Sequence, residues 1–432
     1  MTSVSLSDWV EVRLRDVTDK ALNPDQQVAL ETAEHVNFLP MEAIGEKGEL
    51  DLSLVRERDS VSTGYTLFFE GDVIVAKITP CFENGKGAMI HGLVNGIGFG
   101  TTELHVLRPN SNIEARFLYY ITVSYPFRKL GEANMTGAAG QKRVPDEFVR
   151  NFSILLPPLS EQRTIADYLD HATAKIDTLI AAKQRLLDLL AEKRRALITH
   201  AVTRGLDATV PLRDSGVEWL GEIPRHWEVV SLKMLADVRT GVAKGRTLDS
   251  NFTVSVPYLR VANVQDGYLD LSDVAEIEVL PHEIPSFSLQ KGDVLMNEGG
   301  DADKLGRGTV WDGSIEPCLH QNHVFAVRCF RVDPRWLSTV TDSNYAKAFF
   351  ESRAKQSTNL ASISATNLKE LPVPVPPQEE QWFMMHHLEK SSKTLDRLIQ
   401  ISQGTIKLLH ERRAALISAA VTGKLQIEPI CN

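Results

Sequence analysis

The sequence predicts an α+β fold in which one unit, a globular domain of mixed α/β structure followed by a long helix, is present twice. Three observations lead to this expectation. Residues recur at a nearly constant offset between the two halves, two stretches of more than 40 residues have helical periodicity, and the remaining segments combine short β patterns with turns. A chain of 432 residues is also long enough for two domains of ordinary size.

The repeat is strongest in the helical part of each half. Starting where Pro157 aligns with Pro376, identical residues recur 219 positions apart without a gap. Further upstream the offset drifts to 221, since Gly71-Asp72-Val73 matches Gly292-Asp293-Val294. A period of this length is too long for a solenoid and indicates duplication of a whole domain. The gapless identities include Glu161-Gln162 with Glu380-Gln381, Asp177 with Asp396, Arg194 with Arg413, and Ala201-Val202-Thr203 with Ala420-Val421-Thr422.

Residues 159–205 and 377–425 are predicted to be long helices, because apolar residues recur in steps of three and four as in a coiled-coil seam. Gly205 and Gly423 are expected to end them. About 40 residues form a rod of roughly 60 Å, and its apolar stripe needs a partner. Two rods related by a two-fold axis would pair antiparallel; the alternative is that each packs only on its own domain. The expected seam residues are Leu169, Ile176, Leu179, Leu186 and Leu190 in the first helix, and Leu388, Leu395, Leu398 and Leu409 in the second.

The globular domains are expected at residues 1–158 and 230–376, with 206–229 as the linker into the second repeat and 426–432 as a tail. Alternating apolar patterns predict strands at 65–78, 100–107, 258–264, 293–297 and 324–329, and helical patterns predict helices at 117–129 and 336–354. The glycine-rich run Gly96–Gly100 has no strand–helix context, so a hairpin is favoured over a cofactor loop.

Composition and charge limit the possible classes of protein. The net charge is −9, the acidic excess lies in the globular parts, and both helical segments carry a small basic excess. A protein that bound DNA alone would usually be more basic. The four cysteines are scattered without a Cys-x-x-Cys pair, the N-terminus lacks the pattern of a signal peptide, and no run of 18 apolar residues occurs. We therefore expect a cytoplasmic protein without a membrane segment.

The sequence contains no recognisable catalytic constellation. It lacks the phosphate-binding loop Gly-x4-Gly-Lys-Ser/Thr and the Asn-Pro-Pro-Tyr/Phe tetrad of an amino-methyltransferase. His320 and His323 have no carboxylate cluster beside them in the sequence, so a structural or base-contacting role is favoured over a metal site. We predict a protein that is not an enzyme and binds no metal.

Polar loops carry the most informative side chains, and several of them occupy equivalent places in the two repeats. Lys, Arg, Asn, Gln, Ser and Thr are the residue types that contact bases and phosphates, although a polar loop is often only solvated. The candidate DNA-binding residues are Lys77, Thr79, Asn84, Lys86, Gln141, Lys142, Arg143, Lys244, Arg246, Asn297, Lys304, Arg307, Ser364, Thr366 and Asn367.

Together these features resemble the specificity subunit of Type I restriction–modification systems. The resemblance rests on the helix starts Pro157–Gln162 and Pro376–Gln381, and on the bridge Asp214–Trp227, which looks like the entry into a recognition domain. It also rests on the helix ends Arg194–Leu206 and Arg413–Leu425, each with Ala-Val-Thr. The first copy has only Ser7-Asp8-Trp9 where the bridge would fall.

The resemblance implies that two target-recognition domains each read half of a split double-stranded DNA site. The paired helices would set the gap and dock two methyltransferase subunits, and restriction/translocase subunits would join the complex. It implies no cofactor on this chain, since partner subunits bind S-adenosylmethionine, ATP and Mg, and partners that clamp DNA would account for the acidic charge. The competing hypotheses are a coiled-coil scaffold that does not bind DNA and a self-contained methyltransferase.

Overall fold

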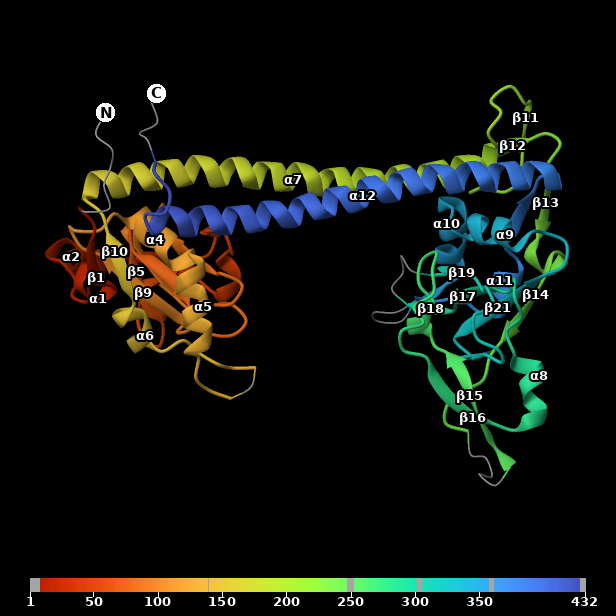
Figure 1. The fold of residues 1–432 in the computed structure, drawn as a ribbon, viewed down its shortest axis with the longest axis horizontal. Coiled ribbons are helices and arrows are strands. Elements are labelled where there is room, and N and C mark those ends of the chain that lie inside the picture. The colour runs from red at the N-terminus through yellow and green to blue at the C-terminus, as the bar shows by residue number, and fades with distance from the viewer. Residues whose placement is uncertain (1–7, 139, 247–251, 301–304, 357–360, 428–432) are drawn as a thin grey trace. The chain divides into compact units, whose positions relative to one another are not determined.

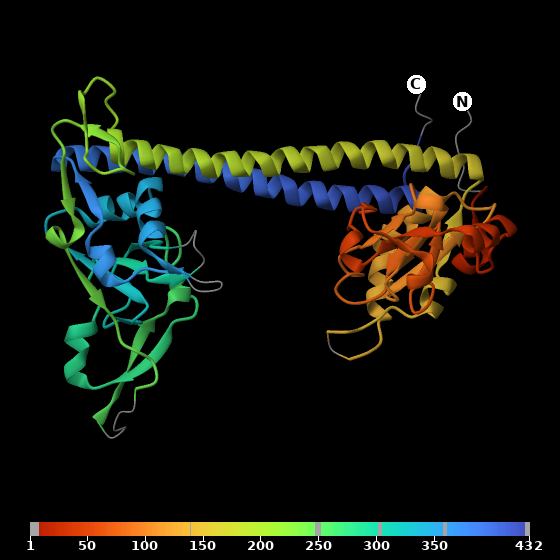
Figure 2. The same cartoon turned by 180° about the vertical axis from the view of Figure 1, so that it is seen from behind.

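The computed structural model describes residues 8–427 except 139, 247–251, 301–304 and 357–360. The chain forms two compact units, Met1–Gln184 with Gln403–Asn432, and Arg185–Ser402 (Figure 1, and from behind Figure 2). Each unit combines one globular domain with parts of the two long helices, α7 (Leu159–Arg204) and α12 (Gln378–Val421). Among the described residues, no helix is both long and apolar enough to cross a membrane.

The globular domain of the first unit is built on two four-stranded sheets with the strand orders β2-β9-β6-β7 and β4-β3-β8-β5. Its core strand β6 (Val73–Ala76) is fully buried, which explains its unbroken apolar sequence. The other strands are β2 (Thr18–Asp19), β3 (His35–Leu39), β4 (Val55–Glu57), β5 (Thr66–Phe69), β7 (Gly87–Met89), β8 (Ile97–Gly100) and β9 (Leu104–Pro109). Helices α1 (Leu14–Val17), α2 (Pro24–Thr32), α3 (Arg58–Val61) and α6 (Asp146–Asn151) lie between them, and β1 (Val10–Arg13) pairs with β10 (Ser153–Leu156).

The hairpin expected at Gly96–Gly100 is wrong, because residues 97–100 form the buried strand β8 between β3 and β5. The glycines are needed for packing there: a Cβ on Gly98 would lie 2.1 Å from the ring of Phe68. The single helices expected at 117–129 and 336–354 are each two helices, α4 (Ala115–Val123) with α5 (Tyr125–Ala133), and α9 (Pro334–Thr341) with α10 (Asn344–Arg353). The breaks fall at Ser124 and Ser343, the N-cap positions of the second helix in each pair.

The second unit contains the sheets β14-β21-β17-β19, β16-β15-β20, β18-β23-β22, β13-β24 and β11-β12. Its strands are β11 (Leu212–Asp214), β12 (Glu222–Pro224), β13 (Glu228–Ser231), β14 (Ala236–Thr240), β15 (Val254–Leu259), β16 (Ala275–Val279), β17 (Val294–Asn297), β18 (Gly299–Gly300), β19 (Gly308–Val310), β20 (Leu319–His320), β21 (Val324–Cys329), β22 (Lys355–Gln356), β23 (Ala361–Ser362) and β24 (Pro372–Val375). Short helices α8 (Ile284–Phe287) and α11 (Ala365–Lys369) complete it. Its main core centres on Trp336 and Trp227, whose rings meet edge to face at 6.1 Å.

Contacts that stabilise the two domains recur at equivalent residues. Asp72, 1% exposed, accepts two hydrogen bonds from Arg108 at 3.0 and 2.8 Å, and Asp293 and Arg328 form the same pair at 2.8 and 2.7 Å. Each aspartate also accepts a backbone N–H three residues before it, so the pair fixes the turn before β6 or β17. A buried charge paired in this way is costly to separate from its partner. The duplication therefore extends to the globular domains.

The long helices pair antiparallel in each unit, as predicted (Figures 1 and 2). In the first unit Asp177 of α7 bonds to Arg413 of α12 at 3.2 Å, and in the second unit Arg194 of α7 bonds to Asp396 of α12. These four residues are equivalent in the repeat, so the two ion pairs are reciprocal. Each globular domain also contacts the C-terminal part of a long helix, through Tyr125 N–H to Ser418 Oγ (2.9 Å) and Asn344 N–H to Thr199 Oγ1 (3.0 Å).

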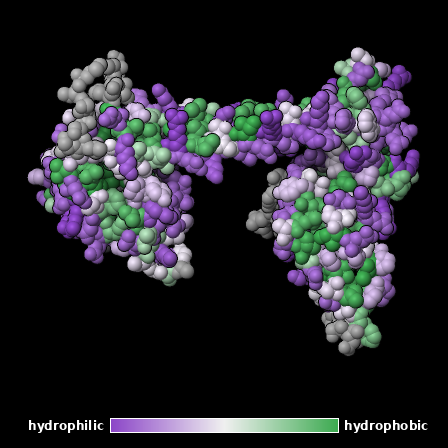
Figure 3. Space-filling model, viewed as in Figure 1, coloured by the Kyte–Doolittle hydropathy of each residue, from purple (hydrophilic) through white to green (hydrophobic). Residues whose placement is uncertain are grey.

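Three of the predicted seam residues lie outside the seam between the helices. Leu179, Leu186 and Leu398 are 52%, 37% and 44% exposed, while Ile180 beside them is 9% exposed. Leu169, Ile176, Leu190, Leu388 and Leu395 are buried as expected, and Leu409 is half-buried. The seam steps from Leu169 to Thr173, whose hydroxyl donates to the Leu169 carbonyl at 2.7 Å and is therefore satisfied when buried. Hydrophobic residues are visible on the surface of the long helices (Figure 3).

Candidate nucleic-acid interface

Two of the predicted polar loops in the first unit are joined by backbone hydrogen bonds. The segment after β6 pairs with the segment before α6: Thr79 N–H donates to the Lys142 carbonyl, and Val144 N–H to the Lys77 carbonyl, both at 2.9 Å. Lys77 N–H donates in turn to the Glu103 carbonyl at 2.9 Å. Three chain segments that are distant in sequence thus meet at one edge of the domain, which the sequence pattern did not predict.

Arg143 and Glu103 form the central ion pair of this edge. Arg143 donates from Nε and Nη2 to the two carboxylate oxygens of Glu103, each at 2.8 Å, and from Nη1 to the Gln141 carbonyl at 3.1 Å. The hydrogen bonds from Arg143 lower the pKa of Glu103, so the carboxylate is charged at neutral pH. The Arg143 side chain remains 43% exposed. Glu103 was not among the candidates predicted from the sequence. Its contact with Arg143, forty positions away, leaves no pattern in the sequence.

The other candidates of the first unit have varied roles. Gln141, Lys142 and Asn84 are exposed, and Lys77 and Thr79 are half-buried. Lys86 donates to the Met41 carbonyl at 2.9 Å, so its ammonium is used within the domain. Buried Arg128 of α5, which sequence reasoning missed, donates to the carbonyls of Phe82 and Gly85 at 2.8 and 3.1 Å and holds the loop containing Asn84.

The second unit uses the same backbone frame with different side chains. Glu298 N–H donates to the His323 carbonyl, and Ile363 N–H to the Glu298 carbonyl, both at 2.9 Å. Glu298, His323 and Ile363 occupy the places of Lys77, Glu103 and Val144. His323 Nδ1 lies 2.6 Å from a Glu298 carboxylate oxygen, so the side chains at the places of Glu103 and Lys77 are hydrogen-bonded to each other here.

Several second-unit candidates have roles within the fold. The prediction that Asn297 contacts DNA is wrong. Its side chain is 1% exposed and donates to the Val264 carbonyl at 2.9 Å, because the loop that contains Val264 covers the end of β17. Ser364 caps α11 by accepting from Asn367 N–H, and Asn367 donates from Nδ2 to the Arg353 carbonyl. Thr366 is exposed and Arg307 is half-buried, while Lys304 lies outside the described residues.

Lys244 and Arg246 lie at a separate hollow of the second unit. They line a cavity of about 440 Å³ together with Arg260, Glu276 and Glu278. Arg246 is bound to Glu283 at 2.6 and 3.1 Å, so its charge is largely compensated within the domain. Lys244 is exposed and remains a candidate for phosphate contact.

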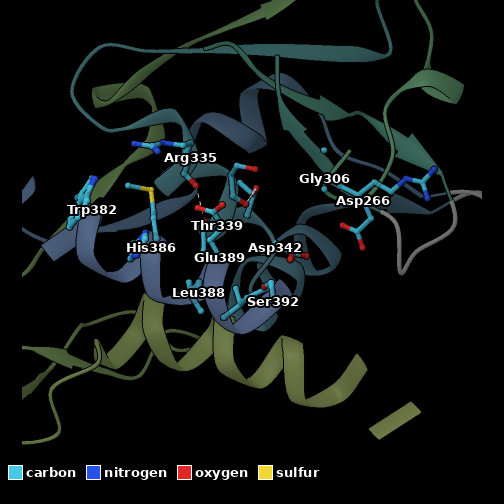
Figure 4. Close-up of a pocket in the computed structure, with 17 residues that line it drawn as sticks. Asp266, Gly306, Arg335, Thr339, Asp342, Trp382, His386, Leu388, Glu389 and Ser392 are labelled. Carbon is cyan, nitrogen blue, oxygen red and sulfur yellow. Dashed lines mark hydrogen bonds between the residues drawn. The ribbon is translucent and has the colours of Figure 1, made fainter. Parts of the chain in front are cut away.

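A cavity of about 370 Å³ lies between α9, the start of α12 and the loops around Asp266 and Gly306 (Figure 4). Arg307 is among its lining residues, and Trp382 stacks on His386 at its rim. In the first unit the equivalent space holds Tyr120 and Arg116, which bond to Asp170 at 2.6 and 2.8 Å. Thr339, a smaller residue, stands at the place of Tyr120 in the second repeat and lines the cavity.

The described residues include no group of three or more His, Cys, Asp or Glu side chains that could hold a metal. His320 is 2% exposed, burial lowers its pKa, and its Nδ1 lies 2.6 Å from the Val324 carbonyl. His320 is therefore a neutral hydrogen-bond donor in the core. The sequence left a structural and a base-contacting role open for it, and this is the structural role. The arrangement offers polar loops and ion pairs on a rigid frame, which suits binding.

A family model described as the Type I restriction modification DNA specificity domain matches residues 6–187 and again residues 224–410. The chain belongs to the family of Type I restriction–modification specificity subunits. The two matches coincide with the two repeats, so both copies carry the family pattern.

Among relatives of this specificity subunit is the EcoAI specificity subunit of Escherichia coli, 48% identical over 147 residues, which are 33% of this chain and 25% of that protein. The aligned part therefore spans only about a quarter of that relative's length. The MjaVIII specificity subunit of Methanocaldococcus jannaschii is 24% identical over 430 residues, covering 98% of this chain and 94% of that one. A solved chain from work on complex assembly and conformational transition of the type I R-M system has a TM-score of 0.69 at 20% identity, covering 97% and 99%. It shows the same fold.

Proposed function

We propose that this chain gives a Type I restriction–modification enzyme its DNA sequence specificity. Each globular domain reads one half of a bipartite target, and partner subunits methylate or cleave the DNA. The observation that carries the proposal is the repeated loop frame: the same backbone pairing presents Lys77, Glu103 and Arg143 in one domain, and Glu298, His323 and Ser362 in the other. One frame with two sets of side chains is what two readers of different sequences require.

The long helices support two further parts of the proposal. Leu179 and Leu408 are 52% and 66% exposed in the first unit, and the equivalent residues Leu398 and Leu189 are 44% and 49% exposed in the second. Each unit thus carries one copy of the same exposed apolar pair, which fits two copies of one partner, the methyltransferase subunit. The helices themselves would set the unspecified gap between the half-sites.

The partner subunits also account for what this chain lacks. With a net charge of −9, the chain is expected to bind DNA weakly by itself, and partners would supply much of the phosphate contact. The same partners would bind S-adenosylmethionine, ATP and Mg, and this chain would be non-catalytic. Restriction/translocase subunits would complete the assembly.

Replacing residues 1–158 with the first domain of another family member tests the two-reader proposal. We expect adenine methylation mapping of the assembled enzyme to show one altered half-site, while the other half-site and the gap stay the same. The reason is that the loops of the first unit are held by contacts within that domain. A change in both half-sites would contradict separate readers, and methylation without sequence preference would favour the scaffold hypothesis.

A further inference from the structure

Arg143 has a defined set of donors left for a ligand. An arginine has five N–H groups in a planar fork. Three are used: Nε and one on Nη2 by Glu103, and one on Nη1 by the Gln141 carbonyl. Within the described part of the chain, this leaves one N–H on each of the two terminal nitrogens, and the side chain is 43% exposed. These two donors share the terminal edge of the fork when the Gln141 carbonyl, two residues earlier in the chain, accepts the Nη1 hydrogen on the Cδ side.

The position of this edge is fixed from both sides. Arg143 exchanges backbone hydrogen bonds with Thr136 at 3.0 and 2.8 Å, and it is flanked by the bonds of Lys142 and Val144 to Thr79 and Lys77. Glu103 is tied to the same frame through its carbonyl, which accepts Lys77 N–H. The carboxylate thus orients the guanidinium from the turn that precedes β9, and less side-chain freedom is lost when a ligand binds.

We propose that Arg143 reads a guanine in the half-site of the first domain through a bidentate contact to O6 and N7, with Glu103 as a positioning residue. The inference rests on the proposed function. Two parallel N–H donors match the two acceptors that guanine presents in the major groove. A phosphate could take the same donors, but that contact would carry no sequence preference.

Among the described residues of the second domain, the position equivalent to Arg143 carries a different side chain. Ser362 stands at the place of Arg143 and pairs by backbone with Gly299, while the side-chain hydrogen bond at that edge joins His323 to Glu298. A serine has one hydroxyl and cannot form the same fork. The guanine contact is therefore assigned to the half-site read by the first domain alone.

The test uses the complete chain assembled with its methyltransferase subunits and duplexes in which each base pair of the target is changed singly. We compare Arg143→Lys, Arg143→Ala and Glu103→Gln with the wild type. The matched control is Arg15→Lys, since Arg15 lies in the same unit, is also 43% exposed and is paired with Asp16. The readout is the ratio of methylation rates on the correct and changed duplexes, which does not depend on how much of the protein is folded.

For Arg143→Ala we expect discrimination to fall about ten- to a hundredfold at one G·C pair only, because both donors to the guanine are lost. Glu103→Gln should weaken discrimination at that same pair, less severely, and Arg15→Lys should leave every ratio unchanged. The inference is overturned if Arg143→Ala keeps all ratios, or if it slows all duplexes equally and lowers the salt slope by about one, as for a phosphate contact. A wild-type complex without any sequence preference would instead contradict the proposed function.

Discussion

Replacing Trp336 with alanine will lower the free energy of unfolding of the second unit by about 3–5 kcal/mol. Trp336 is completely buried in the main core, and its Nε1–H donates to the Pro374 carbonyl at 2.9 Å. Its ring also meets that of Trp227 edge to face. The substitution removes this packing and leaves a buried carbonyl without its donor, which adds to the cost of the cavity. Urea unfolding of the full chain, followed by circular dichroism, measures the effect.

Trp382→Ala is the matched control for this change. Trp382 is 58% exposed at the start of α12 and stacks only on His386 among the aromatic rings of the described residues. The same deletion of side-chain atoms should therefore cost less than about 1 kcal/mol. Equal destabilisation by the two substitutions would show that the core of the second unit is not organised around Trp336.

Lengthening both long helices by one heptad is expected to lengthen the gap of the DNA target by about three base pairs. Duplicating residues 177–183 in α7 and 396–402 in α12 adds about 10 Å to each helix, and base pairs are about 3.4 Å apart along the helix axis. An insertion of seven residues keeps the seam in phase, because the apolar residues of a coiled-coil seam recur every 3.5 residues on average. The change is placed at equivalent positions, so the antiparallel pairing can be kept. Adenine methylation mapping gives the gap directly.

Duplication in α7 alone is the control for helix length. The reciprocal ion pairs Asp177–Arg413 and Arg194–Asp396 could no longer form together, and methylation should be largely lost. If the double variant methylates the original target with an unchanged gap, the helices do not set the spacing.

The sequence was sufficient to predict the duplicated architecture and the antiparallel helices, because gapless identity and heptad spacing are local signals. The seam was predicted correctly at Leu169 and Ile176 but not at Leu179. Leu179 and Ile180 are both apolar, and the buried Thr173 hydroxyl bonds to the Leu169 carbonyl one turn earlier in the same helix, so polarity did not mark the seam. A stripe that is two residues wide cannot be assigned from periodicity alone.

The candidate site was predictable by residue type but not by role. Arg143 was predicted together with Gln141 and Lys142 of its loop, whereas Glu103, which contacts Arg143, lies at the end of another segment. Asn297 looked like a base-reading side chain but is buried beneath a loop that accepts its hydrogen bond. Such distinctions depend on which segments meet in space, and polar composition does not contain that information.

Genome-wide adenine methylation mapping of cells that express this chain with its methyltransferase partners tests whether each repeat reads its own half-site. We expect a single bipartite motif, with two different short half-sites separated by a fixed run of unspecified bases. Methylation at a contiguous motif, or without any motif, would contradict the assignment of one reader to each repeat.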